Sequence, residues 1–379
     1  MKQILLASTA LVAFAGAAAA EVAISGSGRM GMVYDKSIFN DDIVIVNGKA
    51  ERTSDAGFRF SSRVRVAFTL TQETDAGVTF GGSIRADNAS AGNQGNGGSV
   101  FLSGAFGKIS MGDVDGAAES AVGNVSGVGY TGLNDLNEAF YLQQGNSDLD
   151  TNEEISAFAL PAALYEYTSG GFSGYFSLGN PGGVGLGDSQ YFDTVKITVD
   201  AATKEELVKT LAKVSDIVVD QAYGLGAKYS VDNYSVGFGY ESINLSGVVT
   251  DYGSDEVAGG TDDTVSEFDN TLDNWVLGGS ATFGGFTLKA QYGQGSGDTL
   301  DLTQYAFSGD YTFDAWTLTA FWRSVEVERT NGSGSTEAQP FGFGVTYDLG
   351  GGASIAAGAV DPDVLGEDYR ADIGVNFNF

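Results

Sequence analysis

Apolar and polar residues alternate with a period of two along most of this chain. In the segment from Phe58 to Gln72, large apolar residues occupy six of the eight even positions, while Arg59, Arg63 and Arg65 occupy odd ones. Successive side chains of a β-strand point to opposite faces, so this pattern predicts strands with one apolar and one polar face. A helical period is nearly missing from the sequence.

Short turns and long polar connections alternate between the predicted strands. Gly170 with Gly171, and Gly284 with Gly285, mark two of the short turns. Short turns at one end and long loops at the other are typical of transmembrane β-barrels. We count sixteen strands, an even number that closes without free edges and leaves a lumen too wide for strand side chains to fill. The predicted fold is all-β, a 16-stranded antiparallel transmembrane β-barrel forming a single domain over residues 21–379.

The connection over residues 113–161 never settles into a strand pattern. It is rich in Gly, Asn, Asp and Glu, yet it carries apolar residues such as Val122, Tyr130, Leu133 and Phe140. Connections this long are uncommon in compact domains and are usually functional or disordered. A fully solvated segment has little use for so many apolar side chains. We therefore expect this third external loop to fold into the lumen and set the width of a pore.

One connection, residues 181–220, carries a helix signal. Thr203 and Glu206 form a capping-box pattern, and Leu207, Leu211 and Val214 share one helical face. We expect a short helix within an external loop here.

Residues 1–20 have the anatomy of a secretory signal peptide. They contain one Lys, an apolar run and an Ala-rich end before Glu21. The run is short for a membrane-spanning helix. We therefore expect an exported protein from which residues 1–20 are removed.

The composition is acidic and lacks two reactive residue types. The chain has 19 Lys and Arg against 49 Asp and Glu, a formal net charge of −30, and no His or Cys. This acidity argues against nucleic acid as a partner and favours attraction of cations. Without His there is no Ser-His-Asp or Cys-His nucleophilic system and no imidazole zinc site. We expect no enzyme activity and no required cofactor.

Six arginines fall on the lumenal side of the first three predicted strands and the last one. The first and last strands of a closed barrel are neighbours, so these residues form one basic wall: Arg29, Arg59, Arg63, Arg65, Arg85 and Arg370. Five acids of the long loop are candidates to face this basic wall: Asp113, Asp115, Glu119, Asp135 and Glu138. Opposed charges would create a transverse field that orders polar solutes and penalises apolar ones. The alternative is that the arginines and the acids are ordinary solvated residues without a role in ion selectivity.

Several segments resemble one family. FLSGAFGKISMGD, YDLGGGASIAAG and ADIGVNFNF, with the SGxxRMG opening around Arg29, are similar to the general diffusion porins of photosynthetic alphaproteobacteria, the Rhodobacter-type porins. The resemblance spans the mature chain and is weakest in the external loops. It implies a sixteen-stranded homotrimeric channel in the outer membrane of a Gram-negative bacterium, surrounded by lipid. It also implies an inward-folded third loop and a terminal Phe379 that the barrel-assembly machinery reads.

Passive diffusion of small hydrophilic solutes and ions, with a weak preference for cations, is the expected function. The alternative is a substrate-specific outer-membrane channel. We expect the trimer contact at the two shortest strands, residues 99–105 and 108–113, because their apolar band is too low to face lipid of full thickness.

Two other motifs are weaker. GSGRMG, at residues 26–31, matches a dinucleotide-binding fingerprint but lies inside an alternating strand and opens no helix. Asp148, Asp150, Asn152 and Glu154 resemble the start of a calcium loop, but position twelve would be Ala159 rather than Glu. The resemblance implies loosely bound Ca²⁺ at most, with unassigned ligands.

Overall fold

The computed structural model describes residues 21–35, 43–46, 49–52, 57–89, 92–95, 98–143, 161–179, 192–199, 206–251, 264–298, 300–330, 335–363 and 369–379. The predicted signal peptide lies outside these residues, and so do residues 144–160 of the long loop.

Nineteen strands form one sheet in which the paired strands run antiparallel. They are β1 (Glu21–Tyr34), β4 (Phe58–Glu73), β5 (Thr79–Ala89), β6 (Gly92–Gly95), β7 (Ser99–Gly104), β8 (Gly107–Gly112), β9 (Pro161–Ser169), β10 (Phe172–Gly179), β11 (Phe192–Val199), β12 (Glu206–Val231), β13 (Tyr234–Asp251), β14 (Thr264–Phe283), β15 (Phe286–Ser296), β16 (Leu300–Phe313), β17 (Trp316–Arg329), β18 (Ser335–Ala338), β19 (Phe341–Gly350), β20 (Ala353–Asp361) and β21 (Arg370–Asn378). Two further strands, β2 (Ile43–Val46) and β3 (Lys49–Arg52), form a separate hairpin.

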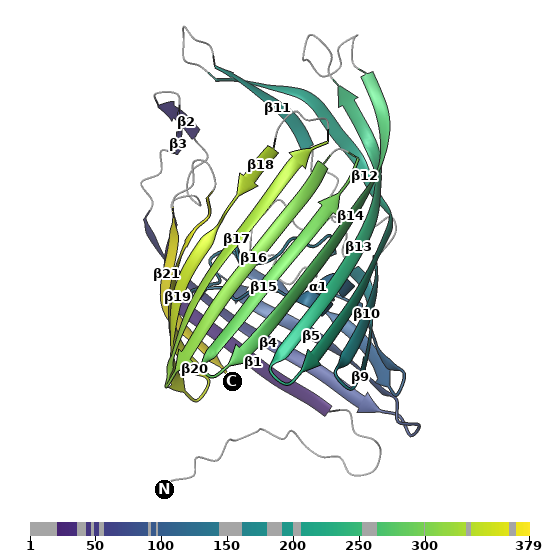
Figure 1. Ribbon diagram of the computed structural model, residues 1–379, viewed down its shortest axis with the longest axis vertical. Helices are drawn as coiled ribbons and strands as arrows, with labels where there is room; N and C mark the ends of the chain where they lie inside the picture. The colour runs from purple at the N-terminus through teal and green to yellow at the C-terminus, as the bar shows by residue number, and fades with distance from the viewer. Residues whose placement is uncertain are drawn as a thin grey trace.

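The sheet closes on itself, because β1 pairs with β4 on one side and with β21 on the other. Three short strands, β6, β11 and β18, pair with β5, β12 and β17 near the ends of those strands. The other sixteen strands follow one another around the ring, so the predicted 16-stranded antiparallel barrel is confirmed (Figure 1). Closure leaves none of these sixteen strands at a free edge of the ring, and a sheet in lipid requires such closure.

The outward-facing residues of the barrel strands are large and apolar. On β4, Phe58, Phe60 and Val64 are exposed, whereas the arginines between them are half-buried on the inner face. Near the ends of the strands, aromatic rings of neighbouring strands pack together. The ring of Tyr34 lies 5.1 Å from that of Phe58 and 5.1 Å from that of Tyr369. Such bands match the aromatic girdles that mark membrane interfaces.

The wall of the barrel has very uneven height. β12, β13 and β14 are 26, 18 and 20 residues long, whereas β7 and β8 have six each. The long strands rise beyond the rim, with β11 beside β12, at the end opposite the short turns and the C-terminus (Figure 1).

The predicted helix within residues 181–220 is wrong. Residues 192–199 form β11, and β12 begins at Glu206. Leu207 pairs with Thr198, and Val214 with Phe192. This segment is rich in β-branched residues, which favour strands, and a neighbouring strand overrides a local capping signal. The β2–β3 hairpin lies within one of the long polar connections, between β1 and β4.

Candidate functional site: a loop inside the barrel

Residues 113–143 follow β8 and lie along the inner face of the barrel. They include α1 (Ala117–Val122), the single helix of the described residues, and none of these residues forms a helix long and apolar enough to cross a membrane. Figure 1 shows α1 inside the ring of strands.

Small residues let α1 lie directly on the wall. A Cβ atom at Gly226 of β12 or Gly237 of β13 would collide with the carbonyl oxygen of Ala117 or Ala121. Both alanines are buried in this contact. The glycines of the wall and the alanines of the helix therefore fit each other, and a larger residue on either side would push the loop into the lumen.

Three inward-facing carboxylates of the wall hold the loop at separate points. The first is Glu241 on β13, whose carboxylate accepts hydrogen bonds from the backbone N–H groups of Leu142 at 2.7 Å and Gln143 at 3.1 Å. The second is Asp310 on β16, whose Oδ2 accepts a hydrogen bond from Ser126 Oγ at 2.7 Å.

The third carboxylate is Asp372 on β21. It accepts hydrogen bonds from the backbone N–H groups of Tyr130 at 3.1 Å and Thr131 at 2.8 Å. Hydrogen bonds to a charged acceptor are stronger than neutral ones, so three such anchors fix the course of the loop.

Apolar packing fills the space between the anchors. One buried cluster joins loop residues to inward-facing residues of β16, β17 and β20, and it consists of Val125, Val128, Leu133, Ala306, Phe321 and Val360. The expectation that the apolar residues of this loop are buried inside the barrel therefore agrees with the structure.

The predicted arginines lie on β21, β1, β4 and β5, four strands that pair in this order. Arg29 of β1 is the direct partner of Arg63 on β4. Arg59 and Arg65 lie on the same face of β4, and Arg85 lies on β5. Arg370 is at the start of β21 and is buried, with its Nε atom 3.5 Å from Asp35 Oδ2. These residues thus form one continuous wall, and their effect on ion flow stays a prediction.

The predicted loop acids differ in exposure. Asp115 and Asp135 are exposed, whereas Asp113, Glu119 and Glu138 are half-buried. The exposed pair therefore presents the carboxylates that are most open to the lumen.

Glu119 is distinct among these acids. Its pKa is raised from 4.5 to about 8, chiefly by burial and additionally by the negative charges of Asp115, Glu138 and Glu241. Asn124 Nδ2 donates a hydrogen bond of 3.3 Å to its Oε1, which opposes the shift. Glu119 is therefore largely protonated at neutral pH and adds little charge to the loop there.

Sequence reasoning missed the carboxylates that hold the loop. Glu241, Asp310 and Asp372 carry a signal that could have found them, because each is an acid at an inward-facing position of a strand. It also overlooked cations across the barrel from the basic wall, such as Lys289 on β15, whose Nζ donates to the carbonyl oxygen of Asn124 at 3.4 Å. The segment at residues 148–154 that resembles the start of a calcium loop lies outside the described residues. Within the described part of the chain, no group of three acidic, His or Cys residues is placed to hold a metal ion.

Comparison with known proteins decides the family. A family profile described as Gram-negative porin matches residues 7–362. The chain belongs to the Gram-negative porins. The porin of Rhodobacter capsulatus is 32% identical, and the alignment covers 95% of this chain and 100% of that protein. The porin of Fuscovulum blasticum is 25% identical, with 95% and 100% covered.

Solved porin structures share the same fold. A porin structure refined at 1.8 Å resolution has 30% sequence identity and a TM-score of 0.61, covering 95% of this chain and 100% of that one. A mutant porin of Rh. blastica, at 21% identity, has a TM-score of 0.58 and supports the fold alone. This porin is thus an outer-membrane channel for solutes and ions of a Gram-negative bacterium, and it is not an enzyme.

Proposed function

We propose that this porin allows passive diffusion of small hydrophilic solutes and ions, with a weak preference for cations. The observation that carries the proposal is the loop inside the barrel, which presents the exposed carboxylates of Asp115 and Asp135. Part of the basic wall is already engaged, since Arg29 donates to the carbonyl oxygen of Thr131 and Arg370 is paired with Asp35. The chain as a whole carries a formal charge of −30, which favours cations near the pore mouth.

Swelling of proteoliposomes in a series of neutral sugars and amino acids of increasing size tests the diffusion mechanism. Passive diffusion predicts rates that fall smoothly with solute size and do not saturate with concentration. A single solute that enters far faster than others of its size, with saturation, would instead support the alternative, a substrate-specific channel.

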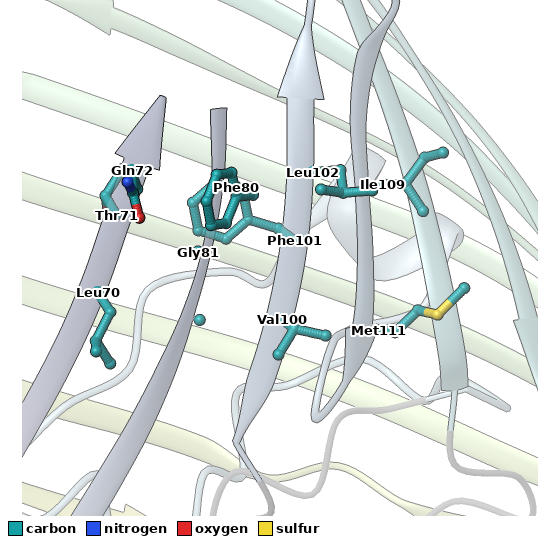
Figure 2. Close-up of a pocket in the computed structure, with 11 residues that line it drawn as sticks. Leu70, Thr71, Gln72, Phe80, Gly81, Val100, Phe101, Leu102, Ile109 and Met111 are labelled. Atoms are coloured by element: carbon teal, nitrogen blue, oxygen red, sulfur yellow. The ribbon is translucent and has the colours of Figure 1, made fainter. Parts of the chain in front are cut away.

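We propose that three copies associate through the low part of the wall. A strand of six residues spans about 20 Å, and less when tilted, whereas the apolar band of such barrels is about 25 Å tall. The outer face here is also hollowed: a cavity of about 570 Å³ is lined by residues of β4, β5, β7 and β8, including Leu70, Phe80, Val100, Leu102 and Met111 (Figure 2). This part of the wall is too short to match the full thickness of the lipid, so a second copy would cover its apolar surface.

We propose that the terminal Phe379 is recognised during assembly by the barrel-assembly machinery. Its ring is exposed on the outer face, and its backbone pairs with that of Gly26 through hydrogen bonds of 2.7 and 2.9 Å. Deleting Phe379 should lower the yield of folded barrel in outer membranes, while Phe379→Trp, which keeps an aromatic terminus, should restore part of it. An undiminished yield of the deletion variant would refute this role.

A further inference from the structure

One residue of the loop bridges the two strands that close the barrel. β1 and β21 pair from Ser27 with Asn378 to Tyr34 with Ala371. On the inner face of this seam, Arg29 Nη1 on β1 donates a hydrogen bond of 3.1 Å to the carbonyl oxygen of Thr131. The N–H and the hydroxyl of Thr131 both donate to Asp372 Oδ2 on β21, at 2.8 and 2.5 Å.

The neighbouring Tyr130 covers the same seam. Gly31 of β1 and Gly374 of β21 are direct partners, and a Cβ atom on either would come within 2.9 or 2.8 Å of the Tyr130 ring. The ring is 4% exposed and packs with Val33 and Ala356. The paired glycines Gly31 and Gly374 therefore provide the space in which the Tyr130 side chain lies across the seam between β1 and β21.

The backbone of the loop is shaped to reach this position. Gly129 has a φ of 81°, and a Cβ atom there would collide with Asp372 Oδ1. After Gly132, three residues that are not glycine, Leu133, Asn134 and Asp135, have φ values of 50°, 65° and 51°. Such left-handed conformations are unfavourable for L residues and persist where surrounding contacts impose them. The turn is thus held in place by the contacts before and after it.

We propose that Asp372 is a positioning residue that couples docking of the loop over residues 113–161, here named the constriction loop, to closure of the barrel, with Thr131 as the bridge. Every other pair of neighbouring barrel strands is consecutive along the chain, so a connection holds the two strands near each other. The β1–β21 pair joins strands from opposite ends of the sequence, and closing the longest loop carries the largest entropy cost. Thr131 finds all its partners when both strands are in place, so loop docking and seam closure stabilise each other.

Hydrogen–deuterium exchange of the folded porin in detergent tests this coupling. The informative variants are Asp372→Asn, which places an amide where three donors converge, and Thr131→Val, which removes the bridging hydroxyl and keeps the shape. Thr131→Ser is the conservative control, since it keeps the hydroxyl. Glu241→Gln is the matched control on the wall, because it alters a buried carboxylate that also binds two successive N–H groups of the loop, but on β13.

We expect peptides covering residues 27–34 and 371–378 to exchange about tenfold faster in Asp372→Asn and Thr131→Val, because a hydrogen bond to a charged acceptor is lost. Thr131→Ser should exchange like the unaltered porin, and Glu241→Gln should accelerate exchange of these two peptides much less than Thr131→Val does, because its anchor lies on β13, away from the seam. If Asp372→Asn does not fold, Thr131→Val carries the test by itself.

Unchanged exchange at the seam in Thr131→Val would overturn the proposal, and so would equal acceleration of the seam in Glu241→Gln, which would indicate general destabilisation. The readout is exchange of backbone amides rather than ion flow. Its outcome is therefore independent of the cation preference proposed above.

Discussion

The carboxylate of Glu241 on β13 accepts a hydrogen bond of 2.7 Å from the backbone N–H of Leu142, at the last described part of the constriction loop. Glu241 is fully buried, and Asn274 Nδ2 donates to the same oxygen at 3.3 Å. Glu241 thus accepts hydrogen bonds from three donors, those of Leu142, Gln143 and Asn274, and a glutamine amide has only one oxygen to accept them. We expect Glu241→Gln to weaken this anchor by about 1.5–3 kcal/mol.

Single-channel recording in planar bilayers checks this prediction. The Glu241→Gln channel should show more open-state noise and additional conductance levels, because one end of the loop moves more freely. A variant with the quiet single level of the unaltered porin would show that the loop does not depend on this hydrogen bond.

Ion selectivity should change with pH near neutrality because of Glu119. Its pKa is raised to about 8, so it is neutral below that pH and negatively charged above it. Cation preference should therefore rise between pH 6.5 and 9.5, roughly one unit or more on either side of this pKa. Glu119→Gln should remove the rise and leave the selectivity at pH 6.5 unchanged. A rise that persists in Glu119→Gln would assign it to another group.

The same shift predicts the direction of a stability effect. Because the pKa of Glu119 in the folded protein lies above its ordinary value of 4.5, the folded state binds more protons between about pH 4.5 and 8. Stability contributed by this group should be present at low pH and should fall as the pH rises through that window. Thermal unfolding of Glu119→Gln should be less sensitive to pH over the same range than that of the unaltered porin.

Removing charge from the basic wall should increase cation preference. Arg63 and Arg65 lie two residues apart on one face of β4, a separation of about 7 Å along the strand. Two cations at this distance repel by roughly 0.6 kcal/mol even in water. The double variant Arg63→Ser with Arg65→Ser should shift the reversal potential toward cations with a small gain in conductance, because it leaves the loop inside the barrel in place. Arg329→Ser is the matched control, because Arg329 is exposed at the end of β17. The shift should shrink at 1 M salt, where the screening length is about 3 Å. Equal shifts in the double variant and the control would place Arg63 and Arg65 outside the selective region.

The proposed trimer contact can be separated from general effects on the lipid-facing wall. Leu102 on β7 and Ile109 on β8 lie on the hollowed outer face, while Leu288 on β15 and Leu318 on β17 have similar exposure on the taller wall. Changing Leu102 and Ile109 to Gln should release monomers at lower temperature on native gels. The matched change at Leu288 and Leu318 should leave the oligomer intact. Trimers that survive equally in both variants would place the interface elsewhere.

The sequence predicted the barrel well because each strand carries its own signal. Alternation on β4, with Phe60 and Val64 against Arg63 and Arg65, assigns both faces without any knowledge of neighbours. The pairing of β1 with β21 follows once the ring is closed, whereas their register is seen only in the structure. The basic wall could therefore be assigned to the lumenal side from the alternation of odd and even positions along each strand.

The course of the loop could not be predicted in the same way. It depends on contacts between residues far apart in the chain, such as Asp372 with Thr131 and Gly226 with Ala117. The predicted helix at residues 203–214 failed for a related reason, since the pairing of β12 with β11 outweighs a local capping pattern. The different exposure of Glu119 and Asp135 likewise arises from the fold and has no signature in the sequence.

The reversal potential of the porin in a planar bilayer, with a tenfold gradient of KCl at low ionic strength and pH 6.5, measures whether the channel prefers cations and whether the acids of the loop cause this preference. A channel whose lumen is set by this loop should give a reversal potential of the sign expected for K⁺ over Cl⁻. Replacing the exposed acids Asp115 and Asp135 by Asn should move the value toward zero or beyond. A potential that favours Cl⁻ in the unaltered porin would rule out the cation preference, and one that does not move in the double variant would show that Asp115 and Asp135 do not determine the selectivity.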